Sequence, residues 1–165
     1  MDRLPLPDQQ SFAPRLSGAG SLRRELEAAL AAAPPDADRA TYRKLILEAN
    51  VAGKGTASMR TWAWKRLKVR YVLDPALAEF RAFAAGMCTT RSPADRGLLC
   101  FLMFARTDRL FREVTLQTVS PHLREPGTVI RPEAVDDAIA TIRRQGRFDW
   151  SAETLAGVRS HLLSS

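Results

Sequence analysis

The sequence is poor in the residues that most often carry catalysis, metal binding or covalent cross-linking. It has only two histidines and two cysteines among 165 residues. His122 and His161 lack ligand spacing to a cysteine or carboxylate, so no metal site is predicted. Cys88 and Cys100 lie in apolar stretches and are expected to be reduced thiols. We therefore expect no cofactor, no small-molecule substrate and no enzymatic activity.

Long apolar runs are absent as well. The longest, residues 98–105, is much shorter than the roughly 20 residues that a membrane-spanning helix needs. The start of the sequence has no signal-peptide pattern. We expect a cytoplasmic protein with no membrane partner, and an apolar content of 45% is enough for a folded core.

Acidic residues are missing from residues 51–73, which carry six basic side chains. On either side of this segment basic and acidic residues almost balance, so nearly all of the formal net charge of +7 lies within it. Trp62, Trp64 and Tyr71 belong to the same segment. A local positive field with aromatic rings inside it is typical of a surface that binds a polyanion.

The hydrophobic periodicity predicts an all-α fold, because every long periodic segment has helical spacing and no alternating strand pattern stands out. We expect about eight helices in one or two packed bundles. Caps and prolines place their starts at Ser21, Asp38, Thr56 or Ser58, Asp74-Pro75, Ser92-Pro93, Asp108, Pro132 and Ser151.

The domain organisation follows from the same pattern. Residues 1–20 contain three prolines and are expected to form a flexible N-terminal arm. Residues 21–165 then form the helical domain. If this domain has two lobes, their boundary is expected near residue 74 or within residues 121–131.

The helix expected over residues 56–73 has two apolar stripes on a helical wheel, with Lys65 and Lys68 between them and Arg66 and Arg70 on the other side. Such a helix should pack on two sides, with Met59 and Trp62 against the preceding helix. We expect it to bind nucleic acid mainly through phosphates. The alternative is a set of solvated side chains with no such role. The candidate DNA-binding residues are Lys54, Thr56, Ser58, Arg60, Thr61, Lys65, Arg66, Lys68 and Arg70.

The order of helix, Gly53 turn and basic helix also suggests a helix-turn-helix, in which the first residues of the second helix face the major groove. Helical hairpins with glycine in the turn are common, so phosphate contacts are expected more than base reading. A phosphate-binding loop is excluded. Glu48 stands where that motif needs glycine, and Gly55 stands where it needs serine or threonine.

Four stretches resemble the BrxA family, the small helical proteins of bacteriophage-exclusion (BREX) defence systems. They are SLRRELEAALAAAP, LILEANVAGKGTASMRTWAWKRLKVRYVLDP, LFREV and DWSAETLAGVRSHLL. Within the second, the matching residues are Asn50, Thr56, Lys65, Arg66, Leu67 and Arg70. The resemblance implies NusB-like helical lobes, double-stranded DNA binding, and work beside a methyltransferase, an ATPase and a phosphatase-like protein. The closing stretch is less basic than in the family, and only Arg159 could be carried over as a DNA contact there.

Two other functions remain open on the sequence. The basic helix could dock on an acidic partner subunit of an assembly, with Trp62 or Trp64 as its anchor. It could also bind single-stranded RNA, provided that Trp62 and Trp64 are exposed for stacking.

Overall fold

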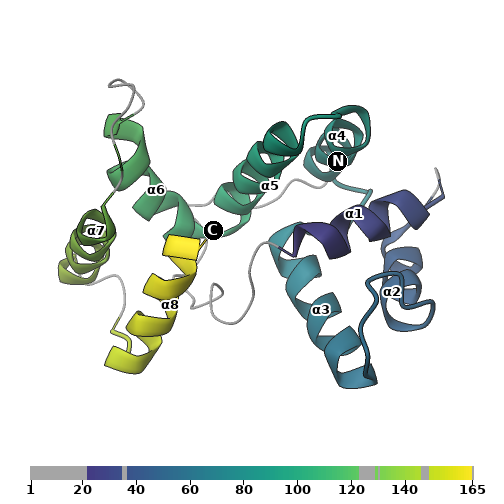
Figure 1. Ribbon diagram of the computed structural model, residues 1–165, viewed down its shortest axis with the longest axis horizontal. Coiled ribbons are helices and arrows are strands. Elements are labelled where there is room, and N and C mark those ends of the chain that lie inside the picture. Colours follow the sequence, from purple (N-terminus) through teal and green to yellow (C-terminus); the bar gives the residue numbers. More distant parts are fainter. Residues whose placement is uncertain (1–21, 35–36, 123–128, 130, 146–148, 165) are drawn as a thin grey trace. The chain divides into compact units, whose positions relative to one another are not determined.

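The computed structural model describes residues 22–34, 37–122, 129, 131–145 and 149–164 (Figure 1). This part of the chain contains eight α-helices and no strand, so the predicted all-α fold is confirmed. The predicted arm, residues 1–20, and the predicted cap Ser21 lie outside the described residues. The helices are α1 (Arg23–Ala32), α2 (Arg39–Leu47), α3 (Ala57–Arg70), α4 (Ala78–Thr89), α5 (Pro93–Thr107), α6 (Arg109–His122), α7 (Pro132–Arg144) and α8 (Ala152–Ser164).

Short polar side chains begin most of these helices, as predicted. The Asp38 carboxylate accepts hydrogen bonds from the hydroxyl and the amide of Thr41, both at 2.7 Å, and these bonds lower the pKa of Asp38. Ser92, Asp108 and Ser151 each accept from the amide three residues onward, at 3.3, 2.9 and 3.2 Å. Each side chain satisfies an amide that would otherwise lack a partner in the first helical turn.

The start of α4 differs from the prediction. Asp74 and Pro75 form a turn, in which the Leu77 amide donates to the Asp74 carbonyl at 3.0 Å, and the helix begins only at Ala78. Before this turn, Val72 and Leu73 adopt left-handed conformations with φ of 69° and 47°. This reversal ends α3 and places Leu73 in the core, where its exposed fraction is 0%. Four residues, 74–77, therefore separate Leu73 from the first residue of α4.

The described helices form two compact units that divide between Thr107 and Asp108. The first unit contains α1–α5 and the second contains α6–α8. The division has no loop, because α5 ends at Thr107 and α6 begins at Arg109. The boundaries suggested near residue 74 and within residues 121–131 each lie inside one unit.

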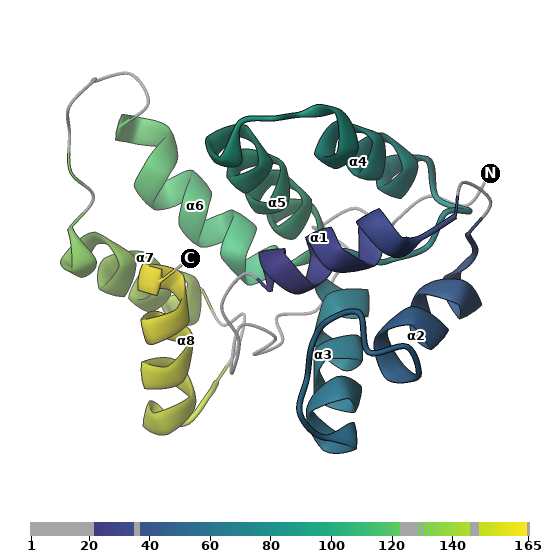
Figure 2. The ribbon, with the colours of Figure 1, turned by 45° about the vertical axis from the view of Figure 1, so that its right-hand side comes forward.

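The first unit is held together by contacts that run from helix to helix. α1 contacts α2 and α4, α3 contacts α2 and α5, and α4 contacts α5 (Figures 1 and 2). Aromatic rings fill its centre: Tyr71 stacks on Phe83 at 5.7 Å between ring centroids, and Tyr42 meets Phe80 edge-on at 5.6 Å. Burying side chains of this size contributes about 1.5–3 kcal/mol each, so the aromatic centre fixes how α2, α4 and the end of α3 lie together.

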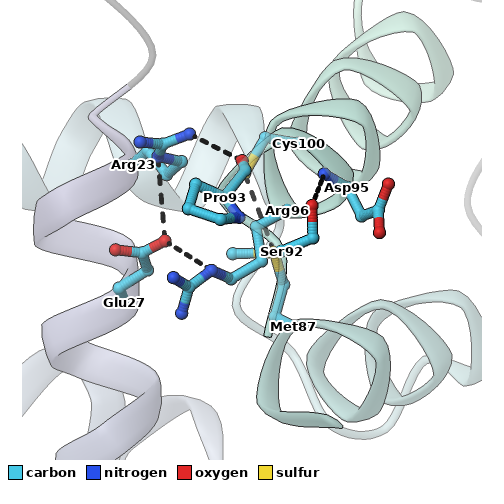
Figure 3. A network of polar contacts seen from close by, with 8 residues as sticks. All are labelled: Arg23, Glu27, Met87, Ser92, Pro93, Asp95, Arg96 and Cys100. Atoms are coloured by element: carbon cyan, nitrogen blue, oxygen red, sulfur yellow. Dashed lines mark hydrogen bonds and ion pairs between the residues drawn. The ribbon is translucent and has the colours of Figure 1, made fainter. Parts of the chain in front are cut away.

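A polar network joins α1 to the start of α5 (Figure 3). The Arg23 guanidinium donates to the Pro93 carbonyl at 3.1 Å and lies 3.7 Å from the Glu27 carboxylate. Arg96 approaches the same carboxylate at 3.4 Å. Nearby, the Cys100 thiol of α5 lies 3.9 Å from the Met87 sulfur of α4, and burial raises the pKa of Cys100. Arg23 and Arg96 therefore stabilise the packing of α1 against the start of α5.

The second unit is organised by α7, whose apolar face contacts α6 and α8. Val135, Ala138, Ile139 and Ile142 are buried at helical spacing, and Val158 of α8 is fully buried. The spacing i, i+3, i+4 and i+7 explains why one face of α7 is apolar along its length. No helix in the described part of the chain has both the length and the apolar character needed to cross a membrane.

Candidate nucleic-acid interface

The connection between α2 and α3 positions the start of the basic helix. Asn50 closes it by accepting from the Lys54 amide at 2.8 Å and donating to the Lys54 carbonyl at 3.0 Å. Gly53, with φ of +62°, lies in the left-handed region that glycine adopts without steric cost. Thr56 then caps α3 by accepting from the Met59 amide at 3.2 Å. This local hydrogen bonding makes the turn a defined structure.

Lys54 does not belong to the exposed basic surface, which corrects the sequence prediction. Its ammonium group lies 2.5 Å from the Glu25 carboxylate of α1, and both side chains are only 17% exposed. The charge is therefore neutralised within the first unit. Glu25 is 29 positions away in the sequence, so the acid-free composition of residues 51–73 gave no sign of this partner.

The connection is also too long for a helix-turn-helix. α2 ends at Leu47 and α3 begins at Ala57, so residues 48–56 lie between them. The motif joins its two helices by about three or four residues. Ala49, four residues before Gly53, is exposed, so it does not form the close helix contact that a small residue there would allow. The helix-turn-helix interpretation is therefore wrong, although α2 and α3 do contact each other.

One side of α3 is open to solvent, and basic and apolar side chains share it. Ser58, Trp62, Lys65 and Val69 follow its centre at helical spacing, and all four are exposed. Thr61 and Lys68 flank this line on one side, and Met59 and Arg66 flank it on the other. We call these eight residues the α3 face. Its charged members are Lys65, which is exposed, and Arg66 and Lys68, which are partly exposed.

The apolar members of the α3 face differ from the prediction. Met59, Trp62 and Val69 were expected to pack against a neighbouring helix, but their exposed fractions are 49%, 36% and 41%. Only the other stripe is in the core, where Ala63, Trp64 and Leu67 are buried. The buried residues of α3 therefore lie on one side of the helix, and α2 and α5 are the helices that contact α3.

Arg70 lies on the buried side of α3, which is a second correction. It is 4% exposed, and its guanidinium carbon lies 4.5 Å from the centre of the Phe104 ring. The Thr107 hydroxyl donates to the Arg70 carbonyl at 2.8 Å. Both contacts fasten the end of α3 to α5, so Arg70 acts in the fold and cannot reach a phosphate at the surface.

The remaining predicted residues lie at the start of α3. Thr56 is exposed, but its hydroxyl oxygen is already used by the cap. Arg60 is partly exposed and its Nε atom is buried. Of the nine predicted residues, the structure therefore brings five together on the α3 face: Ser58, Thr61, Lys65, Arg66 and Lys68. Arg60 lies on the opposite side of α3, about 200° around the helix from Ser58, and Lys54 and Arg70 do not contribute.

Sequence reasoning missed two features of this site. The first is Glu25, whose carboxylate removes one positive charge through a contact that only the tertiary structure creates. The second is the exposure of Met59 and Val69, whose helical spacing looks the same whether a neighbour covers them or not. Among the described residues, no group of three or more His, Cys, Asp or Glu side chains gathers as a metal site would require.

Comparisons with protein-family models, with curated proteins and with solved structures found no match for this chain.

Proposed function

We propose that this protein is a non-enzymatic, double-stranded DNA-binding protein that contacts mainly phosphates through the α3 face. The observation that carries this proposal is the open side of a helix without acidic residues, on which Lys65, Arg66 and Lys68 lie together with Trp62. Positive side chains on one exposed face attract a polyanion over several ångströms and exchange its counterions on contact.

Phosphate contact fits this face better than base reading. The polar residues near the start of α3 are short, and the Thr56 hydroxyl oxygen is engaged in the cap. Lysine binds phosphate as a flexible point charge and carries little sequence information. We therefore propose weak sequence preference and binding that depends strongly on salt.

The biological setting that we propose is a BREX-type phage-defence system in the cytoplasm. It follows from the resemblance of the second stretch to the BrxA family, and Lys65 and Arg66 of that stretch lie on the α3 face. In this setting the protein would hold DNA for the methyltransferase, ATPase and phosphatase-like components. A NusB-like arrangement of the helices is part of the same proposal.

A charge-reversal experiment tests DNA binding directly. A fluorescently labelled duplex is titrated at low salt with the unaltered protein and with a Lys65→Glu, Lys68→Glu variant. We expect the variant to bind at least about tenfold more weakly, because two phosphate contacts become repulsive. The matched control is Arg143→Glu with Arg144→Glu, the same change of charge on exposed residues of α7, which should bind as the unaltered protein does. No binding at low salt, or equal losses in both variants, would refute the proposal.

A second candidate function is supported by the exposed apolar side chains of the α3 face. Phosphate binding does not require Met59, Trp62 and Val69 to be in solvent, whereas a protein partner could bury them around a central tryptophan. An acidic partner subunit would satisfy both the apolar and the basic residues. Trp62→Ala separates the two functions, since it should abolish partner binding and change duplex affinity only slightly.

The RNA alternative requires base stacking, and of the two tryptophans named for it only Trp62 is exposed. Trp64 is buried and cannot stack on a base, whereas Trp62 is 36% exposed. Competition of the labelled duplex by a single-stranded RNA of equal length measures this preference. RNA that displaces the duplex efficiently, with the effect lost in Trp62→Ala, would favour the RNA alternative.

A further inference from the structure

The second unit has a groove between α7 and α8 that the proposed DNA-binding face does not use. Its volume is about 650 Å³, and it is lined by residues of both helices. The floor is apolar and consists of Ile139 and Ala140 from α7 and Leu155 and Ala156 from α8. A groove between two contacting helices has the width and shape to receive a third helix, as in many helix-in-groove complexes.

The two ends of the groove differ in charge. At one end the Arg159 guanidinium lies 2.5 Å from the Asp136 carboxylate, so this arginine already has a counter-charge. Arg143 and Arg144 lie at the other end, in the last turn of α7. Arg143 contacts Asp149 at 2.9 Å, but that carboxylate is 91% exposed and holds the arginine weakly.

Arg144 donates to the neutral Thr141 hydroxyl at 3.2 Å. The groove lining as a whole has three arginines and one aspartate. This excess of positive charge is concentrated where α7 ends, and the carbonyl groups of a helix C-terminus make such a cluster stable there. Among the described lining residues there is no aromatic ring on which a base could stack.

From this arrangement we infer that the α7–α8 groove binds an acidic amphipathic helix of a partner protein, with its apolar side chains on Ile139 and Leu155 and its carboxylates at Arg143 and Arg144. The apolar floor supplies the buried area, and the bidentate geometry of arginine with carboxylate supplies orientation. The Asp136–Arg159 pair leaves the opposite end without an excess charge, so the acidic end of the partner helix lies at the C-terminal end of α7. This inference does not rest on the proposed DNA binding.

The experiment uses the full chain and a labelled amphipathic peptide with leucine at helical spacing and glutamate near one end. A second peptide carries lysine in place of each glutamate. Fluorescence anisotropy should show binding of the acidic peptide and at least about tenfold weaker binding of the lysine peptide, because the latter meets like charge. Chemical-shift mapping should place the acidic peptide along residues 139–144 and 155–159.

Two variants of the groove decide the proposal independently. Arg143→Glu with Arg144→Glu should weaken binding of the acidic peptide at least tenfold. Ala140→Trp should weaken binding as much, because the added ring fills the groove from an exposed position. Ala152→Trp, an exposed residue of α8 outside the lining, is the matched control for the added ring. Circular dichroism shows whether each variant folds. If Ala140→Trp does not fold, the arginine variant alone tests the proposal.

Failure of this proposal is separable from failure of DNA binding. Equal affinity for the two peptides, no binding of either, or unchanged binding in the arginine variant would overturn it. Loss of peptide binding in Lys65→Glu, Lys68→Glu would overturn it too, since the peptide would then occupy the α3 face. If the arginine variant lost duplex affinity and kept peptide affinity, these arginines would belong to a nucleic-acid site instead.

Discussion

Arg70 shows that the surroundings of a basic side chain decide whether it contributes to stability or to the charged surface. Its guanidinium is 4% exposed and lies over the Phe104 ring, a contact that is worth about 1–2 kcal/mol when desolvated. Arg70→Ala also leaves a cavity, so we expect the free energy of unfolding to fall by about 2–3 kcal/mol. Duplex affinity should stay unchanged. Urea denaturation and duplex titration of the same preparation measure both quantities.

Lys65→Ala is the control for Arg70→Ala because Lys65 is an exposed residue of the same helix. It should change the free energy of unfolding by less than about 0.5 kcal/mol and weaken duplex binding. The reverse pattern, in which Arg70→Ala weakens DNA binding without loss of stability, would mean that Arg70 reaches the surface.

The two cysteines should differ sharply in reactivity. Cys88 is exposed, whereas Cys100 is 4% exposed and burial raises its pKa. Because the thiolate is the reactive form, a raised pKa leaves less of it at any pH below that pKa. We expect iodoacetamide at pH 8 to label Cys88 in the native protein and Cys100 only after unfolding, as measured by mass spectrometry. Equal labelling rates in the native state would contradict the buried position of Cys100.

The charges of the basic segment could be counted from the sequence, but their partners could not. Lys54 and Arg70 are identical in type to the residues of the α3 face. One is neutralised by Glu25 and the other is covered by α5. Both outcomes depend on contacts between segments distant in the chain. Lys65 and Lys68 lie on the solvent-facing side of α3, where a side chain needs no partner from a distant segment.

The turn before α3 offers a matched pair of glycines. Gly53 has φ of +62°, which costs an L-amino acid about 1–2 kcal/mol. A methyl group at either Gly53 or Gly55 would meet no atom within 4 Å, so any difference between them is conformational. We expect Gly53→Ala to lower the free energy of unfolding by about 1 kcal/mol. Gly55→Ala should be neutral or slightly stabilising, because alanine restricts the unfolded chain.

Thermal denaturation of the two glycine variants checks this expectation. Equal midpoints would indicate that the turn does not hold Gly53 in the left-handed region, and that the Asn50–Lys54 hydrogen bonds do not define it. A shift confined to Gly53→Ala supports a turn that fixes the start of α3.

Helix starts were predictable where the cause is local. Asp38, Ser92, Asp108 and Ser151 act on an amide three residues away, so a short window of sequence contains the whole interaction. The start of α4 was not predictable from a local cap. Val72 and Leu73 adopt left-handed conformations after α3, and the chain forms a turn before α4 begins. The faces of α3 were not predictable either, since an apolar stripe does not reveal whether a neighbour covers it.

At the scale of the whole chain, the helices could be predicted from the sequence but the boundary between the two units could not. The number and type of helices followed from periodicity, whereas the division between Thr107 and Asp108 has no loop to signal it. The net charge of the segment 51–73 also overstates the number of basic residues on the surface that we propose for DNA binding. The segment has six basic residues, but the burial of Arg70, the Lys54–Glu25 pair and the position of Arg60 on the other side of α3 leave three on the α3 face: Lys65, Arg66 and Lys68.

The salt dependence of duplex binding measures this reduced number. Each neutralised phosphate contributes about −0.9 to the slope of log affinity against log salt, so three contacts give about −2.7 and six would give about −5.4. We expect a slope of about −2.5 to −3 for the unaltered protein. Lys65→Ala should reduce its magnitude by about one, and Lys54→Ala should leave it unchanged, because the Lys54 charge is already paired with Glu25. A slope near −5 that falls equally in both variants would show that Lys54 leaves Glu25 to bind DNA, and the α3 face would then have to be extended into the turn that precedes it.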